Sequence, residues 1–447
     1  MSDDDDPQAP NKTARPLDIL FLTENFPPET NAAATRVYER ACYWAKWGHR
    51  VTVLTSAPNF PEGRLYHGYA NRWRQVEEMD GIRVVRVKTY MAANRGTVRR
   101  TLDFLSFMAS AFLIGLFERR PDVISATSPQ FFAAVGGWAL GAVRRVPFVF
   151  ELGDLWPASI VAVGAMRPSL PLRMIEKLEL FLYRRSAAVV ALTDAFKRNL
   201  VRRGIDADKI AVVINGVDTW RYAPQSRDAA LAAETGLTGK FVIGYVGTHG
   251  MAHALRNVLD AADTLRDRPD VAFLLAGGGA EREALVADAE RRALTNVVFL
   301  ERQPKDRMPA VWSLCDVALV HLKNSPVFED VIPSKMFEAM AMGLPILMAS
   351  PKGEASAILE ADGAGRHVPA EDPEALGHAV RALKDDPDGL SALAENSLAA
   401  APRHSRKAQA RRMIAVLEAA RRGEGRHAAG VAERALAQTG VSEEVQR

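Results

Sequence analysis

The sequence predicts an α/β protein of two domains, each built around an open parallel sheet of its own. The chain has 447 residues, more than one hydrophobic core usually holds, so two domains are the natural expectation. Short apolar runs alternate with helical stretches from Leu17 to Asp218, and a fresh alternation begins at Lys240. Such runs are typical of strands covered by helices on both faces. We therefore expect one domain over residues 17–220 and a second over residues 221–402.

Composition places the chain among globular proteins with a full core. Hydrophobic residues make up 48% and charged residues 25% of the chain, and the net charge is +3. Cys42 and Cys315 lie far apart in apolar segments, which favours core positions in a protein of a reducing compartment. Residues 1–16 are acidic and lack an apolar core, so they predict a disordered tail rather than a signal peptide. Residues 423–447 predict a second tail with one short helix.

The first strand, loop and helix predict a ligand-facing loop. The strand covers Leu17–Thr23, the loop is ENFPPETNAAATR, and the helix runs to about Trp47 before a strand at Arg50–Thr55. This order forms a right-handed parallel unit, and ligands of such sheets sit beyond the carboxyl ends of the strands. The small residues around Asn31 and Ala32 would let a ligand approach the backbone. The loop lacks the glycines of a dinucleotide fingerprint, which argues against an NAD site.

The rest of the first domain continues the alternation. Further strands are expected at residues 81–88, 122–127, 147–151, 187–193 and 209–218. Residues 57–69 form a loop rich in proline and aromatic residues, of a type that often serves function. Asp154 follows the strand that ends at Glu151, where an acid suits a general base or a ligand to a sugar hydroxyl. A helix or turn cap is the alternative.

An unusually apolar helix is expected over residues 98–120. The segment Phe104–Phe117 carries no charge and is shorter than the roughly 18 to 20 residues needed to cross a bilayer. Two interpretations stay open: a buried helix of the outer layer, or a helix that dips into one leaflet with its arginines at anionic headgroups. The second interpretation assigns the membrane or acceptor contacts to Arg99, Arg100, Phe104, Phe107, Phe112, Phe117, Arg119 and Arg120.

The second domain is expected to bring several loops to one edge of its sheet. Its strands are predicted at residues 240–247, 271–279, 296–300, 316–322 and 344–350. Loops that begin at Gly247 and Thr248, and at Gly277, follow the first two of these strands. Arg256 is the expected phosphate partner near the first loop, because a guanidinium stays charged. His249 and His253 lack a third ligand at metal spacing, so no metal is expected.

The stretch FEDVIPSKMFEAMAMGLPILMAS is the expected centre of the site. Ser334 is expected to cap a helix with its hydroxyl and to leave the amides of Lys335 and Met336 free. With the lysine ammonium beside it, such a helix start suits a phosphate. Asp330 precedes it and Glu338 lies one turn inside, which suggests a ligand with hydroxyls near its phosphates, such as a nucleotide sugar. An ordinary capped helix with solvated acids is the alternative.

A basic helix is expected over residues 403–422, with a possible packing site on the first domain. Its apolar stripe would be formed by Met413, Ile414, Val416 and Leu417, and its arginines would form the opposite face. A solvated basic face is the default interpretation, and a membrane-facing patch is the alternative.

Taken in order, these motifs resemble the retaining glycosyltransferases of family 4, which have the GT-B fold of two Rossmann-like domains facing a cleft. The resemblance covers about Leu17 to Arg422 and rests on FPPETNAAATRVYERACYWAKWGHRVTVLT, PNFPEG, DLWP, INGVD, YVGT and IPSKMFEAMAMGLPI. It is closer to the branch that builds colanic acid, O-antigen and other bacterial surface polysaccharides.

The resemblance implies a nucleoside-diphosphate sugar donor in the second domain, without a metal or other cofactor. Ser334, Lys335 and Met336 match the segment that binds the pyrophosphate, and Glu338 matches the second acid of a paired-glutamate motif, which holds the ribose. Asp330 stands where the family usually has the first glutamate, which contacts the sugar.

Other positions depart from the family pattern. The Asn31-Ala32-Ala33 loop replaces a diglycine near the phosphates, and THGMAHALRN replaces a loop that often carries arginine and lysine. The histidine that many members carry after the strand ending at Glu151 is missing. Asp330 and Asp154 are therefore the candidate catalytic acids.

The expected function is transfer of a sugar to an undecaprenyl-diphosphate-linked acceptor on the cytoplasmic face of the plasma membrane. The branch suggests a UDP-linked, N-acetylated sugar, and no nucleic-acid partner is expected. Two other functions are compatible with these residues: a GT-B-like UDP-sugar epimerase, and a noncatalytic nucleotide-sugar-binding partner of a polysaccharide complex.

Overall fold

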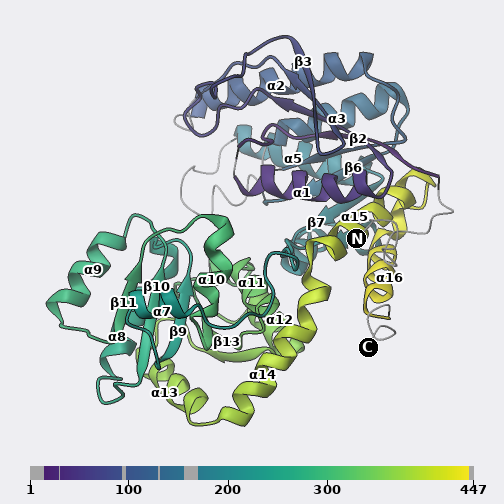
Figure 1. Ribbon diagram of the computed structural model, residues 1–447. Coiled ribbons are helices and arrows are strands. Elements are labelled where there is room, and N and C mark those ends of the chain that lie inside the picture. The colour runs from purple at the N-terminus through teal and green to yellow at the C-terminus, as the bar shows by residue number, and fades with distance from the viewer. Residues whose placement is uncertain (1–14, 30, 93–96, 129–130, 156–169, 442–447) are drawn as a thin grey trace. The chain divides into compact units, whose positions relative to one another are not determined.

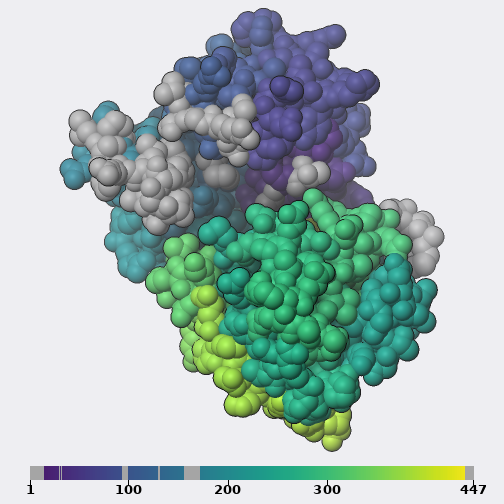
Figure 2. Space-filling model, turned by 90° about the vertical axis from the view of Figure 1, so that its left-hand side faces the viewer, coloured from purple at the N-terminus to yellow at the C-terminus, as the bar shows by residue number. Residues whose placement is uncertain are grey.

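The computed structural model describes residues 15–29, 31–92, 97–128, 131–155 and 170–441, which form two compact units (Figure 1). Unit 1 takes the chain up to Asn215 together with the part from Arg406 onward, and unit 2 spans Gly216–Ser405. In Figure 2 the purple and blue surface belongs to unit 1 and the green surface to unit 2. The observed boundaries lie a few residues from the expected positions 220 and 402.

Unit 1 contains one sheet with the strand order β3-β4-β2-β1-β5-β6-β7-β8. Its strands are β1 (Asp18–Leu22), β2 (Arg50–Ser56), β3 (Arg74–Met79), β4 (Ile82–Val87), β5 (Val123–Thr127), β6 (Phe148–Leu152), β7 (Ala188–Ala191) and β8 (Ile210–Val212). Apart from the antiparallel pair β3–β4, the strand pairs in the described residues are parallel. The sequence analysis missed β3 because this edge strand, RQVEEM, is half exposed and has no apolar run.

Two layers of helices cover the unit 1 sheet. They are α1 (Ala32–Lys46), α2 (Thr97–Phe117), α3 (Phe131–Arg144), α5 (Leu170–Arg185), α6 (Asp194–Arg202), α15 (Arg406–Arg421) and α16 (Ala428–Val441), with short 3-10 turns η2 (Ala207–Lys209) and η7 (Gly425–His427). Helices α1 and α15 pack together on one face, where the Trp44 indole donates to the Ala410 carbonyl at 3.0 Å (Figure 1). Helices α2 and α3 cover the other face.

The basic helix of the sequence analysis is α15, and two of its arginines correct the expectation. Met413 and Leu417 are buried as expected. Arg411 and Arg412 are also buried, and Arg411 lies over the Trp47 ring at 5.6 Å. Because α15 is enclosed between α1 and α16, these two arginines do not contribute to a solvated basic face.

Unit 2 contains a parallel sheet with the strand order β11-β10-β9-β12-β13-β14. Its strands are β9 (Phe241–Val246), β10 (Val271–Ala276), β11 (Val297–Leu300), β12 (Val317–His321), β13 (Ile346–Ala349) and β14 (Gly365–Val368). The connections run outward in opposite directions from β9 and β12, so the switch point of the sheet lies between these two strands. Ligands of open parallel sheets bind beyond the carboxyl ends of the strands at such a point.

Helices surround the unit 2 sheet on both faces. They are α7 (Ala229–Glu234), α8 (Arg256–Asp263), α9 (Arg282–Arg291), α10 (Met308–Ser313), α11 (Lys335–Ala341), α12 (Glu354–Asp362), α13 (Pro373–Lys384) and α14 (Pro387–Ala400). Short 3-10 turns are η3 (Met251–His253), η4 (Lys305–Arg307), η5 (Pro326–Phe328) and η6 (Ala401–His404). The core contains Ile243, Phe273, Leu319 and Leu347 from four neighbouring strands, which fixes their carboxyl ends at one edge.

Candidate functional site

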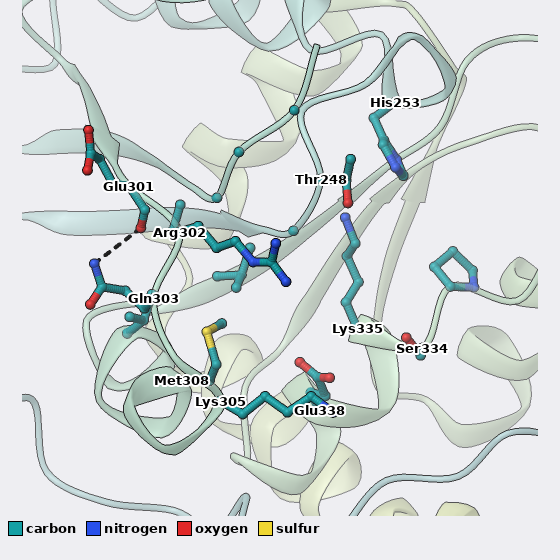
Figure 3. A pocket seen from close by; sticks show the side chains of 18 of the residues that line it. Thr248, His253, Glu301, Arg302, Gln303, Lys305, Met308, Ser334, Lys335 and Glu338 are labelled. Atoms are coloured by element: carbon teal, nitrogen blue, oxygen red, sulfur yellow. Dashed lines mark hydrogen bonds between the residues drawn. The ribbon is translucent and has the colours of Figure 1, made fainter. Parts of the chain in front are cut away.

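A cavity of about 940 Å³ opens at the carboxyl ends of the unit 2 strands (Figure 3). Segments that follow β9, β10 and β11, together with the start of α11, supply most of its walls. Its lining residues are Tyr222, Val246, Gly247, Thr248, His253, Ala276, Gly277, Gly278, Gly279, Glu301, Arg302, Gln303, Lys305, Met308, Val311, Leu322, Val331, Pro333, Ser334, Lys335 and Glu338. The sequence analysis expected Gly247, Thr248 and Gly277 at this edge, and the structure places all three in the wall.

Two glycines let backbone form part of this wall. The Gly247 amide donates to the Ala276 carbonyl and the Gly277 amide to the Leu300 carbonyl, both at 2.9 Å. These hydrogen bonds hold the carboxyl ends of β9, β10 and β11 in register. Gly277 has φ +145°, and a Cβ there would overlap the Gly247 carbonyl. Gly247 has φ +150°, and a Cβ there would lie 2.9 Å from the Lys335 Nζ. Glycine is required at Gly277 because neighbouring backbone leaves no room for a side chain, and at Gly247 because other residues rarely adopt its positive φ.

Lys335 is the most perturbed cation of the cavity. Its Nζ lies 3.6 Å from the centroid of the Tyr245 ring. Within the described part of the chain this Nζ is buried and has no hydrogen-bond partner. The residue as a whole is partly exposed, but the Nζ, which carries the charge, is buried. Burial lowers the pKa of Lys335 to about 7, and the nearby Glu338 carboxylate opposes that shift in part.

Glu338 lies one turn further along α11 and also faces the cavity. Its Oε2 accepts a hydrogen bond from the Trp312 Nε1 at 3.2 Å, which fixes the carboxylate. Figure 3 shows Lys335, Glu338 and Arg302 pointing into the same space. Cationic groups and a carboxylate thus line one cavity, as the resemblance implied for Lys335 and Glu338.

The start of α11 differs from the expectation. Ser334 has helical backbone angles, φ −59° and ψ −27°, and its hydroxyl makes no capping hydrogen bond to the described residues. The Met336 amide donates to the Pro333 carbonyl at 3.1 Å, so it is not free. The Met336 side chain is fully buried in the core. Ser334 therefore contributes to the cavity as a wall residue, and Met336 does not contribute.

The structure contradicts the prediction that Arg256 is the phosphate partner. Its side chain is 72% exposed and pairs with Asp288 at 3.4 Å, and it is not one of the described lining residues. The cations that line the cavity beside Lys335 are Arg302 and Lys305, which the sequence analysis missed. The sequence could have predicted these two residues, because both follow β11 and therefore lie at the carboxyl end of a third neighbouring strand.

The two candidate catalytic acids lie in different units. Asp330 is exposed and, as far as the chain is described, is not part of the cavity wall, although Val331 is. Asp154 lies in unit 1 after β6, where its amide donates to the Ser128 Oγ at 3.3 Å. Trp156 and the rest of that loop up to residue 169 lie outside the described residues.

The expected ligand loop of unit 1 is the start of α1. The Asn31 Oδ1 accepts from the Ala34 amide at 2.9 Å, so Asn31 is the helix cap, and Ala32 is the first helical residue. Further along α1, Arg36 and Arg40 donate to the Glu151 Oε1 at 2.7 and 2.9 Å. These buried ion pairs hold α1 against the carboxyl end of β6.

The histidines of the β9–α8 segment are perturbed by burial. His249 is fully buried, and burial lowers its pKa to about 4. His253 lines the cavity, and its Nδ1 lies 3.3 Å from the His321 carbonyl. Within the described ranges, no group of three or more His, Cys, Asp or Glu side chains could hold a metal ion.

Comparison with known proteins gives consistent matches over both units. Residues 31–216 match the family described as "Glycosyl transferase 4-like domain", and residues 228–399 match "Glycosyl transferases group 1". The "Putative colanic acid biosynthesis glycosyl transferase WcaI" of Escherichia coli is 27% identical over 337 residues, covering 73% of this chain and 82% of WcaI. The "Probable glycosyltransferase WbjE" of Pseudomonas aeruginosa is 26% identical, covering 67% and 73% of the two chains.

A solved structure shows the same architecture. The crystal structure of Anabaena Alr3699/HepE in complex with UDP superposes with a TM-score of 0.66 at 18% identity, covering 90% of this chain and 100% of that one. At this identity the match supports the fold.

Proposed function

Because this chain belongs to glycosyltransferase family 4, in the branch that builds bacterial surface polysaccharides, we propose that it transfers a sugar from a nucleoside-diphosphate donor held in the unit 2 cavity. The chain has the GT-B fold of two Rossmann-like units that the resemblance implied. The proposal concerns the donor, the acceptor and the stereochemical course of the transfer.

One observation carries the donor assignment: a lysine Nζ is buried at a cavity wall without a hydrogen-bond partner among the described residues. A buried amine is stabilised as a cation when an anion comes beside it. Gly247 and Gly277 line the same cavity with their backbone, and Arg302 and Lys305 add positive charge. A diphosphate meets these requirements.

The rest of the cavity suits the rest of a nucleotide sugar. Its volume of about 940 Å³ lies within the roughly 300–1,000 Å³ that small-molecule sites usually have. The Glu338 carboxylate can accept hydrogen bonds from two ribose hydroxyls, since carboxylate oxygens have several acceptor positions. Trp312 fixes the orientation of that carboxylate before a ligand arrives.

We propose a retaining transfer. The bond between the anomeric carbon and the diphosphate breaks, and its electron pair stays on the phosphate oxygen. The acceptor hydroxyl bonds to that carbon from the same side, and its proton passes to the departing phosphate. Lys335 and Arg302 would stabilise the negative charge that grows on the diphosphate, which lowers the barrier only if they are held in place beforehand. Burial of the Lys335 Nζ supplies that fixed position.

The proposed acceptor is a lipid-linked saccharide, of the undecaprenyl-diphosphate type, on the cytoplasmic face of the membrane. Helix α2 exposes an apolar stripe in which Leu102, Leu113 and Phe117 are 48%, 52% and 87% exposed. Exposed arginines flank the stripe at residues 99, 100, 119 and 120. Such a face fits an anionic membrane surface.

The structure changes two details of this membrane interpretation. Phe107 is fully buried in the unit 1 core, so it is not a membrane contact. Among the described residues, the segment Arg99–Phe117 is long and apolar enough to cross a bilayer by length and composition, with 28% of it buried. Core helices pass the same test, so the exposed stripe rather than the length supports the proposal.

A transfer assay tests the proposal. The protein is incubated with a panel of radiolabelled UDP- and GDP-sugars, N-acetylated hexosamines included, and with bacterial lipid extract. We expect label to enter the lipid phase with one donor, and this transfer to be lost in Glu338→Gln and kept in Arg256→Ala. Conversion of the donor without any lipid would instead identify an epimerase, and binding without turnover a noncatalytic partner.

A further inference from the structure

We propose that the unit 2 cavity binds its anionic ligand together with one proton, which Lys335 takes up from solvent as the ligand enters. The inference rests on the proposed function, because the anion is the diphosphate of the donor. It concerns the charge state of the free cavity, which the sequence does not reveal.

The contacts of Lys335 do not stabilise a positive charge on its Nζ in the free protein. Its Nζ faces the Tyr245 ring at 3.6 Å, and the Tyr245 hydroxyl is engaged elsewhere, donating to the Thr248 carbonyl at 2.7 Å. No hydrogen-bond acceptor for this Nζ occurs in the residues that the structure describes. The ring face attracts a desolvated ammonium by about 2 kcal/mol or somewhat more, which is less than the several kcal/mol that desolvation of a buried charge costs. The neutral amine is therefore a substantial form of the free site.

Several other ionisable groups surround the cavity. The basic ones are His249 and His253 after β9, Arg282 of α9, Arg302 and Lys305 after β11, and His321 of β12. The acidic ones are Glu338 of α11 and Glu301 after β11, with Glu371 beside His321. Tyr245 remains neutral because burial raises its pKa. The basic groups oppose a charge on Lys335, and Glu338 favours one.

Burial moves the pKa values of the three histidines away from neutral pH. Burial lowers the pKa of His249 and of His321 to about 4, and it lowers that of His253 as well. The His321 ring lies between the His253 carbonyl oxygen, 2.7 Å from its Nδ1, and the Asn257 side-chain amide, 2.8 Å from its Nε2. Lys335, with a pKa lowered to about 7, is the group that responds near neutral pH.

Ligand entry shifts the protonation equilibrium of Lys335 towards the ammonium form. The donor's diphosphate carries two negative charges, and an anion beside a buried amine raises the pKa of that amine. The amine is then protonated in the complex and half neutral in the free protein at about pH 7, so binding must take up a proton. Above that pH, affinity falls by about tenfold for each pH unit, because the free site must first gain its proton.

Calorimetry measures the proton directly. A nucleotide sugar is titrated into the full chain in buffers of different ionisation enthalpy. UDP-N-acetylglucosamine and GDP-mannose are the probes, because each phosphate of their diphosphate keeps one strongly acidic group, which stays ionised throughout the neutral pH range. With a free pKa of about 7, we expect uptake of about 0.5 proton at pH 7 and about 0.9 proton at pH 8. The dissociation constant should rise about tenfold between pH 8 and pH 9 and be nearly flat below pH 6.

Variants assign the proton to its residue. In Lys335→Arg the guanidinium is charged at all these pH values, so proton uptake should vanish and the dissociation constant should lose its pH dependence. Arg256→Ala is the matched control, because this exposed arginine lies beside Asp288 and should leave the uptake unchanged. His253→Gln should also leave it unchanged.

The outcomes separate the two proposals. Binding with less than about 0.1 proton taken up at every pH would overturn this inference and leave the donor assignment intact. Uptake that persists in Lys335→Arg, or that disappears in His253→Gln, would assign the proton to another group and overturn it as well. If neither probe binds, nor any sugar of the donor panel, the proposed function fails and the inference fails with it.

Discussion

Replacing Lys335 with methionine should make the free protein more stable while it removes donor binding. Methionine has a similar length and volume but no amine, so it fills the space over the Tyr245 ring without a group that needs solvation. Most substitutions of buried residues destabilise a protein. The opposite sign is expected here because the amine serves the ligand and not the fold.

The magnitude follows from the pKa. The ordinary pKa of a lysine is 10.5, and burial lowers that of Lys335 to about 7, a difference that corresponds to roughly 4 to 5 kcal/mol. In the unfolded chain the lysine keeps its proton up to about pH 10, so at neutral pH burial costs roughly 4 to 5 kcal/mol. The attraction between the Tyr245 ring and an ammonium offsets about 2 kcal/mol of this. A net stabilisation of about 2 to 3 kcal/mol remains for the methionine variant.

Thermal unfolding at two pH values measures this difference. For a unit of this size, about 2 to 4 °C in Tm correspond to each kcal/mol, so we expect Tm to rise by at least about 4 °C near pH 7. The folded pKa is lowered, so the penalty is fully present below about pH 7 and is relieved as the pH rises towards 10.5. The gap between wild type and variant should therefore shrink at about pH 9.5.

An exposed lysine of the same unit provides the control. Lys352→Met should change the free energy of unfolding by less than about 0.5 kcal/mol at either pH. If Lys335→Met is less stable than wild type, or if the gap does not depend on pH, then Lys335 is charged and well paired in the free protein, and the argument is refuted.

Three further predictions follow from particular contacts. Glu338→Gln should lower kcat/KM for transfer at least about tenfold with little change in Tm, because an amide accepts hydrogen bonds from the ribose hydroxyls less well than a carboxylate. If the variant and the wild type have equal kcat/KM, Glu338 does not bind the ribose. Gly277→Ala should destabilise unit 2 by about 2 kcal/mol or more, while Gly278→Ala, whose Cβ meets little, should unfold like wild type in urea. Phe117→Asp should weaken binding to vesicles with anionic lipid at least about tenfold, and Met251→Asp, at an exposed apolar residue of unit 2, should not; equal losses in a flotation assay would exclude α2 as the membrane face.

Much of the fold was accessible from the sequence because parallel strands buried on both faces leave continuous apolar runs. Strand β3 was missed for the converse reason, since it lies at a sheet edge and alternates between half-exposed and exposed positions. Strand β14 was also missed, because its residues GRHV include just one that is fully buried. Strand position in the sheet, rather than propensity, decided which elements the sequence revealed.

Within the site, the sequence located segments better than side chains. Lys335 and Glu338 lie one turn apart on the same helix, so both reach the same cavity. Arg256 and Arg302 each follow a strand of the same sheet, and spacing alone could not tell which side chain turns inward. The exposed Arg256 side chain pairs with Asp288 of α9, which lies more than thirty residues away in the chain. The sequence did not reveal this contact. Ser334 failed as a cap because its backbone is already helical.

A structure of the protein with a bound nucleotide sugar tests the central claim most directly. We predict that a diphosphate oxygen lies about 2.7–3.2 Å from the Lys335 Nζ and that the ribose hydroxyls donate to the Glu338 carboxylate. A nucleotide bound outside the unit 2 cavity, or one whose diphosphate does not reach Lys335, would contradict the account.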